Sequence, residues 1–135
     1  MNYWLVKTEP ETFSWDDLIK KGSSMWDGVR NFQARNNLRK MKTNDTLLFY
    51  HSGKNPGIVA IAKVVREHYP DPTAKEGDWS VVDVEPVRQL KRFISLQEVK
   101  QVPELSEMVL LKASRLSVQP VTKEEYNAIL ELEKS

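Results

Sequence analysis

Three capping boxes constrain this chain to short helices that begin at defined residues. In a capping box, a serine or threonine hydroxyl accepts a hydrogen bond from the first turn, and an acidic side chain three residues later binds back. Motifs of this kind start at Ser14, Ser95 and Thr122, and each has apolar residues at the flanking staple positions. We therefore expect three short helices, each fixed at its first turn by its own sequence.

A fourth helix is predicted from Asn31 to Met41, because Ala34, Leu38 and Met41 recur at the spacing of one helix face. The segments between the helices are rich in β-branched and aromatic residues, which favours strands. We expect strands over residues 3–7, 45–51, 58–69, 79–87 and 115–118.

These elements do not alternate regularly, as the units of a parallel βαβ sheet would. The sequence therefore predicts an α+β fold whose mostly antiparallel sheet curls into a small barrel flanked by short helices. A chain of 135 residues suits a single domain. A barrel of that size has little space inside, so a ligand is expected at its mouth.

The composition excludes several kinds of site. The chain has no cysteine, which rules out disulfides, cysteine nucleophiles and thiolate metal sites and fits a reducing compartment. The first ten residues lack the long apolar core of a signal peptide, and no apolar run approaches the roughly 18 residues of a membrane span. We expect a cytoplasmic protein with no membrane association, no metal and no cofactor.

Motifs of the common enzyme classes are absent. The chain has no Gly-x-Ser-x-Gly elbow, P-loop, His-Glu-x-x-His or dinucleotide fingerprint. Its histidines, His51 and His68, cannot form a zinc site without cysteine unless carboxylates complete it. His51 and Ser52 are adjacent on a predicted strand and face opposite sides, which argues against a catalytic pair. We expect a structural or ligand-binding His51 and no catalytic residue.

Binding residues are indicated by the segment MWDGVRNFQARNN, residues 25–37. Trp26 precedes a turn signal, and the next 17 residues, from Gly28 to Asn44, carry three arginines and two lysines but no acid. The whole chain has a formal net charge of only +1, so nucleic-acid binding would depend on a local patch or a specific pocket. Two interpretations stay open: a solvated helix face capped by Asn31, or amides and arginines that contact base edges and phosphates. Likewise, Trp26 is either a core residue or an exposed stacking platform.

Six segments, in order, resemble one known family: YWLVKTEP, WDGVRNFQARNNLRKM, LLFYHS, PGIVAIAKVVREHYPDPT, WSVVDV and RLSVQPV. Together they are similar to the EVE domain family, in particular to the thymocyte nuclear protein group and its bacterial relatives, over residues 2–132. The resemblance implies that residues 1–135 form a single EVE domain with a PUA-like pseudo-barrel, akin to YTH and ASCH domains. It also implies a nucleic-acid partner, DNA or RNA, that carries a modified base.

The resemblance assigns residues to that site. Trp26 is expected to stack on an extruded base, with Tyr50 as a candidate second wall, while Thr8 and Asn31 read its edge. The full set of implied ligand-binding residues is Lys7, Thr8, Glu9, Trp26, Asp27, Gly28, Val29, Arg30, Asn31, Tyr50, His51 and Ser52. We further hypothesise that Arg35, Arg39 and Lys42 contact the nucleic-acid backbone.

Two other functions stay open at this point. One is an ASCH-like RNA hydrolase that uses Lys7, Glu9 or His51 as acid–base groups. The other is a small-molecule or protein-interaction module that keeps the fold without the nucleic-acid role. The sequence leaves open which base is bound, whether the strand is DNA or RNA, and the oligomeric state.

Overall fold

All three capping boxes begin helices, as the sequence predicts. In the computed structural model, which describes residues 1–135, they start α1 (Trp15–Lys21), α3 (Leu96–Gln101) and α5 (Lys123–Glu133). In the first box the Ser14 hydroxyl accepts from the Asp17 amide at 3.1 Å, and the Asp17 carboxylate accepts from the Ser14 amide at 2.8 Å. Each box therefore satisfies backbone groups that a helix end would otherwise leave unpaired.

The predicted fourth helix is also present, as α2 (Phe32–Lys40). Its apolar stripe, Ala34 and Leu38, is fully buried together with Met41, which follows the helix. Two short elements have no clear signal in the sequence, the 3-10 helix Pro103–Leu105 and α4 (Val109–Lys112). Both lie between α3 and the last strand.

Six strands form one sheet in the order β2-β5-β4-β3-β1-β6. Neighbouring strands are antiparallel except β1 and β3, which are parallel. The α+β class and the mostly antiparallel sheet are thus confirmed, but β2 and β6 are separate edges and the sheet does not close into a barrel. The strands are β1 (Tyr3–Thr8), β2 (Ser24–Met25), β3 (Thr46–His51), β4 (Gly57–Pro70), β5 (Ser80–Ser95) and β6 (Val118–Val121).

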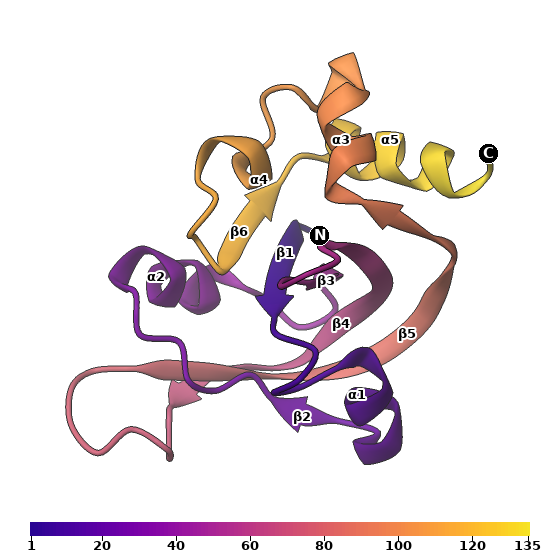
Figure 1. Cartoon of the computed structure of the whole chain (residues 1–135). Helices are drawn as coiled ribbons and strands as arrows, with labels where there is room; N and C mark the ends of the chain where they lie inside the picture. Colours follow the sequence, from indigo (N-terminus) through magenta and orange to yellow (C-terminus); the bar gives the residue numbers. More distant parts are fainter.

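The sheet curls because its longest pair of strands is bent. β5 extends eight residues beyond its predicted end at Val87, and Figure 1 shows it crossing the molecule above β2 and α1 before it bends up toward α3. Its pairing with β4 shifts register at four places, one of them next to Pro86. Bulges of this kind accommodate a proline within a strand and increase its bend. Pro120 lies in β6, an edge strand, where a missing N–H is tolerated.

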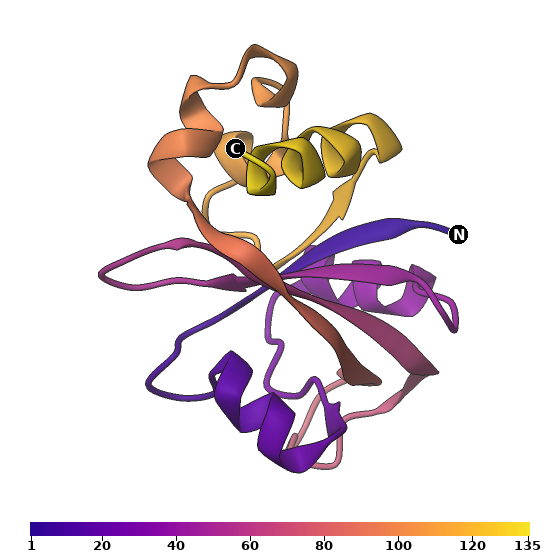
Figure 2. The same ribbon diagram turned by 90° about the vertical axis from the view of Figure 1, so that its right-hand side faces the viewer.

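Both faces of the sheet are covered by helices. Alternate residues of the central strands point to opposite sides, so Trp4 and Phe49 enter one apolar cluster while Leu5 and Tyr50 enter another. The first cluster includes residues from α1 and α2, and the second includes residues from α3, α4 and α5. Figure 2 shows α3 and α5 on one side of the strands and α1 on the other.

One buried carboxylate ties the N-terminus to the turn before β3. Asp45 accepts from the backbone of Asn2 at 3.0 Å, from the Trp4 indole at 3.0 Å and from the backbone of Lys42 at 2.9 Å. It is almost inaccessible to solvent. β1, β3 and the end of α2 therefore share a single anchor.

Asp45→Ala is expected to destabilise the fold by about 3 kcal/mol, because it leaves buried donors without an acceptor. The measurement is the free energy of unfolding in urea. Glu104→Ala is the matched control, since Glu104 is exposed and makes no side-chain hydrogen bond or ion pair. Equal stability of the two variants would contradict the role of Asp45.

Candidate functional site

A cavity of about 520 Å³ opens beside the C-terminal end of β1. Its wall comes from β1, the turn before α1, the end of α1, β2 with the loop that follows it, and one residue before β6. Its volume is within the range of about 300–1,000 Å³ typical of small-ligand sites. The lining residues are Lys7, Thr8, Thr12, Phe13, Lys21, Ser24, Met25, Trp26, Asp27, Gly28, Val29, Arg30 and Ser117.

Trp26 is a wall of this cavity and not an exposed platform. Only 7% of the residue is accessible, so the interpretation of an exposed stacking face is wrong. Its ring packs edge to face against Phe13, with centroids 6.1 Å apart, and against Phe49, with centroids 5.5 Å apart. These contacts hold the indole in one orientation.

The indole N–H of Trp26 remains available to a ligand. It makes no hydrogen bond within the protein, and the sole buried, unpaired side-chain polar atom is Gln119 Oε1. The Trp26 N–H is therefore not sealed from solvent, and Trp26 is one of the residues that line the cavity. The site thus combines an apolar ring with a free hydrogen-bond donor.

The cavity also has a free acceptor and an excess of positive charge. Asp27 is exposed and has no ion-pair or hydrogen-bond partner, while Lys7, Lys21 and Arg30 contribute three cations. Lys7 Nζ donates to the carbonyl of Ser114 at 2.6 Å, and burial lowers the pKa of its ammonium. This lining suits a ligand that has both an amine and a negatively charged group.

Thr8 lines the cavity with its hydroxyl already engaged. Its Oγ1 donates to the carbonyl of Phe13 at 2.7 Å, so the hydroxyl can offer a ligand only its acceptor lone pairs. The same hydrogen bond fixes the turn that places Phe13 against Trp26.

Two predicted ligand residues lie outside this cavity for structural reasons. Tyr50 points to the opposite side of β3 from Phe49, into the second apolar cluster, and burial raises the pKa of its phenol. Asn31 caps α2, where its side-chain oxygen accepts from the Ala34 amide at 2.9 Å. Neither side chain is among those that line the cavity, and Phe13 takes the place expected for Tyr50.

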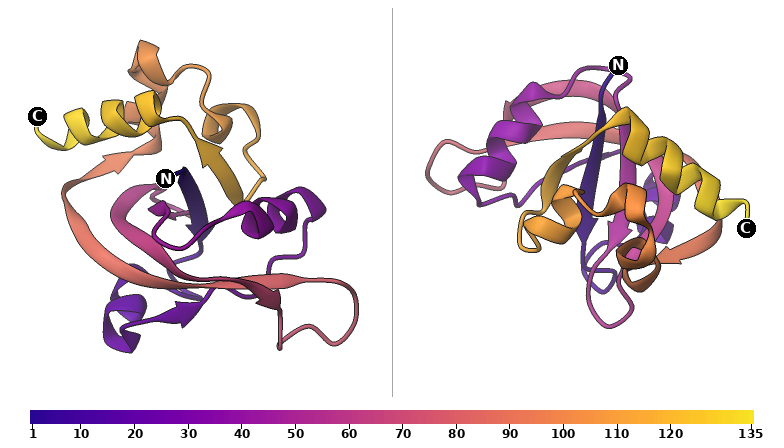
Figure 3. Two further views of the ribbon diagram at one scale, coloured as in Figure 1. Left: turned by 180° about the vertical axis from the view of Figure 1, so that it is seen from behind. Right: turned by 90° about the horizontal axis from the view of Figure 1, so that it is seen from above.

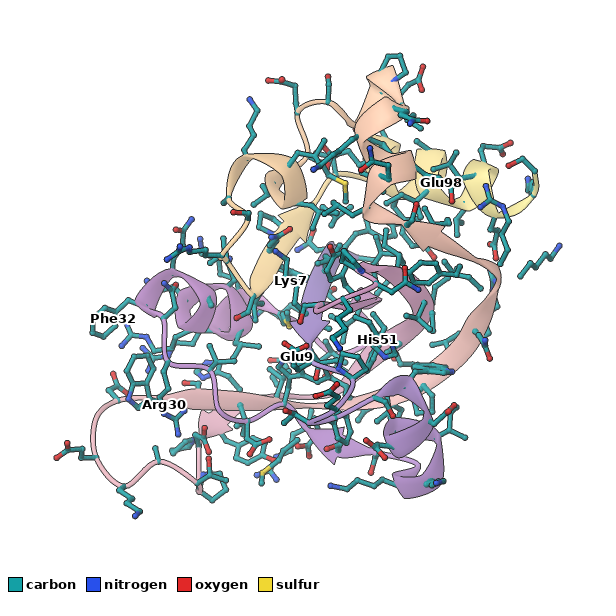
Figure 4. The ribbon with its side chains drawn as sticks, viewed as in Figure 1. Lys7, Glu9, Arg30, Phe32, His51 and Glu98 are labelled. Atoms are coloured by element: carbon teal, nitrogen blue, oxygen red, sulfur yellow. The ribbon has the colours of Figure 1, made fainter.

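Glu9, His51 and Ser52 line a different cavity, of about 600 Å³. His51 Nε2 accepts from the backbone amide of Trp15 at 3.1 Å, which assigns a neutral ring with its proton on Nδ1. Burial lowers the pKa of His51, and the charge of Asp16 opposes this in part. His51 is therefore a structural residue that fixes the start of α1. Figure 4 shows Lys7, Glu9 and His51 near the centre of the molecule. Lys7 nevertheless lines the first cavity, whereas Glu9 and His51 line the second.

A buried carboxylate from the β4–β5 loop fixes the rim of the first cavity. The Asp71 side chain is fully buried and accepts from the Gly28 backbone at 3.1 Å and from Arg30 Nη1 at 2.9 Å. It also accepts from the backbone and hydroxyl of Thr73, at 2.7 and 2.6 Å. Burial alone would raise the pKa of Asp71, but the hydrogen bonds from Thr73, Arg30 and Gly28 outweigh it and lower the pKa from 3.8 to about 2.

The predicted backbone-binding cations are paired with acids in the structure. Arg35 and Arg39 both approach Asp78, with Arg39 Nη2 2.7 Å from its carboxylate, and Lys42 Nζ lies 4.0 Å from Glu67. Figure 3 shows the β4–β5 loop beside α2 in both views. The acid-free run of the sequence is therefore partly neutralised by acids that are distant in the chain.

Sequence reasoning missed several lining residues. Phe13 was assigned only a staple position before α1, and Lys21 was not singled out. The place of both on the cavity depends on how α1 packs against β2. The others lack any distinctive pattern: Thr12, Ser24, Met25 and Ser117. No group of three or more acidic or histidine side chains is arranged to hold a metal ion, and no helix is long and apolar enough to span a membrane.

Comparisons with known proteins match the chain along almost its whole length. The family model described as EVE domain matches residues 2–132. Thymocyte nuclear protein 1 of Mus musculus is 46% identical over an alignment 168 positions long, which covers 99% of this chain and 74% of the relative. The crystal structure of human THYN1 protein in complex with DNA that contains 5-methylcytosine superposes with a TM-score of 0.94 and 41% identity, covering 100% of this chain and 99% of that one. A Zymomonas mobilis ASCH protein shares only the fold, at 10% identity and a TM-score of 0.64.

The Asp71 network predicts a pH-dependent contribution to stability. A carboxyl group whose pKa falls from 3.8 to about 2 on folding adds about 2 kcal/mol above pH ~4, and about half of this is lost by pH 3. The stability difference between wild type and Asp71→Asn should therefore shrink as the pH falls from 7 to 3, measured by urea unfolding. Glu76→Gln, in the same loop but exposed, is the control and should show no such change. A difference that stays constant with pH would contradict this account.

Proposed function

Because the chain belongs to the EVE domain family, we propose that it is a non-catalytic module that binds a modified base in DNA. The base is of the 5-methylcytosine kind and occupies the cavity walled by Trp26. The observation that carries the proposal is the human THYN1 complex with 5-methylcytosine DNA, whose protein superposes on the full length of this chain at 41% identity. The residues that line the cavity supply the polar and apolar groups for contact with such a base.

The polar groups of the cavity match the edges of a cytosine. Cytosine offers an exocyclic amine as a donor and ring positions as acceptors. The unpaired carboxylate of Asp27 suits the amine, and the free N–H of Trp26 suits an acceptor. Phe13 and Trp26 supply apolar surface for the flat ring and its methyl group. Lys7 and Lys21 have no acidic partner and attract the flanking phosphates.

The free energies of base stacking and base extrusion together indicate whether single strands or duplexes should bind more tightly. Stacking of a base on an aromatic ring contributes about 1–3 kcal/mol, and extruding a base from a duplex costs a few kcal/mol. The two nearly cancel in a fully paired duplex. Single strands, mismatches and other weakened pairs should therefore bind more tightly than a perfect duplex.

Several features support a binder over a hydrolase. Lys7 and Glu9, the acid–base candidates of an ASCH-like enzyme, line different cavities. His51 is engaged through Nε2 with the start of α1. The likeness to an ASCH protein is one of fold alone.

Thr12→Trp is expected to abolish binding of a 5-methylcytosine oligonucleotide, because an indole at the exposed rim would fill the cavity. This variant is preferable to Trp26→Ala, since Trp26 is a core residue whose removal would cost about 3–5 kcal/mol of stability. Binding is measured by fluorescence anisotropy with a labelled single strand. Asn127→Trp, on an exposed position of α5, is the control and should bind as wild type does. Retained binding by Thr12→Trp would place the base elsewhere.

Wild type should also prefer 5-methylcytosine over cytosine in an otherwise identical strand. Burial of one methyl group contributes about 0.8 kcal/mol, which corresponds to about fourfold in affinity. A larger ratio would indicate a closely fitted methyl site. No preference in the same anisotropy titration, or cleavage of the strand during it, would contradict the proposal.

A further inference from the structure

The most exposed aromatic side chain of the protein lies beside the base cavity. Phe32, the first residue of α2, is 66% exposed. Its ring stacks on that of Trp79, with centroids 5.2 Å apart and planes inclined by 14°. Hydrophobic stabilisation scales with the area removed from water, so a ring this exposed contributes little to folding. We call these two rings the Phe32–Trp79 stack.

Two arginines flank the stack. The guanidinium carbon of Arg35 is 5.0 Å from the Phe32 centroid and 5.8 Å from the Trp79 centroid, and that of Arg30 is 5.7 Å from Trp79. Arg35 is held by hydrogen bonds to the carbonyl of Asp78 and to the side chain of Asn36. Flat rings with adjacent guanidinium groups are the surface on which single-stranded nucleic acid binds, because bases stack and phosphates pair with the cations.

The stack is continuous with the cavity. Arg30 lines the cavity, pairs with Asp71 at its rim and lies over Trp79. Figure 4 shows Arg30 and Phe32 on the same side of the molecule, beside the β4–β5 loop, with Phe32 directed outward from α2. Arg30 therefore connects the cavity to the Phe32–Trp79 stack.

We propose that the Phe32–Trp79 stack is a second stacking site, which binds the base next to the one held in the cavity. This inference rests on the proposed function. One face of the Phe32 ring is covered by Trp79, and the exposed remainder accepts the flanking base. Stacking of this kind tolerates any base, so the second site adds affinity without adding sequence preference.

The two sites predict different responses to two probes. The first probe is the free nucleoside 5-methyl-2′-deoxycytidine, which can fill only the cavity, and the second is a single-stranded heptamer with one central 5-methylcytosine. Phe32→Ala should weaken heptamer binding about tenfold, within the range of about 5- to 150-fold expected for one stacked base, and leave nucleoside binding unchanged. Titration calorimetry measures the heptamer, and NMR shift titration measures the nucleoside.

Two further variants complete the experiment. Val87→Ala removes another exposed apolar side chain, 53% accessible and far along β5, and should bind both probes as wild type does. Phe32→Tyr keeps a ring and should restore heptamer binding. The inference is overturned if Phe32→Ala binds the heptamer as wild type does, or if it weakens both probes equally. If the wild-type protein binds neither the nucleoside nor the heptamer, the proposed function itself is overturned.

Discussion

The buried carboxylate of Asp71 is the interaction on which the candidate site depends. It joins the loop after β2, which carries the cavity rim, to the loop between β4 and β5, which leads to Trp79. Gly28 and Arg30 donate to it from one side, and Thr73 donates from the other. A buried charge with hydrogen bonds from both loops is costly to separate, so neither loop can move far without the other. The position of the Phe32–Trp79 stack relative to the cavity is thereby fixed.

The same loop explains why a cationic sequence run does not give an evenly cationic surface. Asp71, Asp78 and Glu67 come from β4 and the loop after it, and they pair with cations of the run from Gly28 to Asn44. Among the residues that line the cavity, Lys7 and Lys21 carry a charge without an acidic partner. A protein of net charge +1 can therefore present a local attraction for phosphates without general affinity for polyanions.

Local signals in the sequence predicted the elements well and their assembly less well. Capping boxes are formed within a few residues, so Ser14, Ser95 and Thr122 fixed their helices independently of the rest of the fold. β5 was predicted too short because the polar residues Arg88 and Gln89 follow the alternating segment, and only pairing with β4 shows that the strand continues. The barrel stays open because its end strands, β2 and β6, do not pair with each other, and no sequence pattern revealed the two-residue strand β2. Location in the cytoplasm stays a prediction.

The site was predicted where it follows from one contiguous motif and missed where it depends on side-chain direction. Trp26 to Arg30 lie together on the cavity because they are consecutive in one loop. Tyr50 was wrongly expected beside Trp26, because a one-residue difference on β3 decides which face a side chain occupies, and Phe49 occupies that face. The burial of Trp26 also changes what the indole can do. An exposed ring would bind any flat surface, whereas a ring held by Phe13 and Phe49 offers one fixed wall and one N–H, so the shape of the cavity can discriminate between bases.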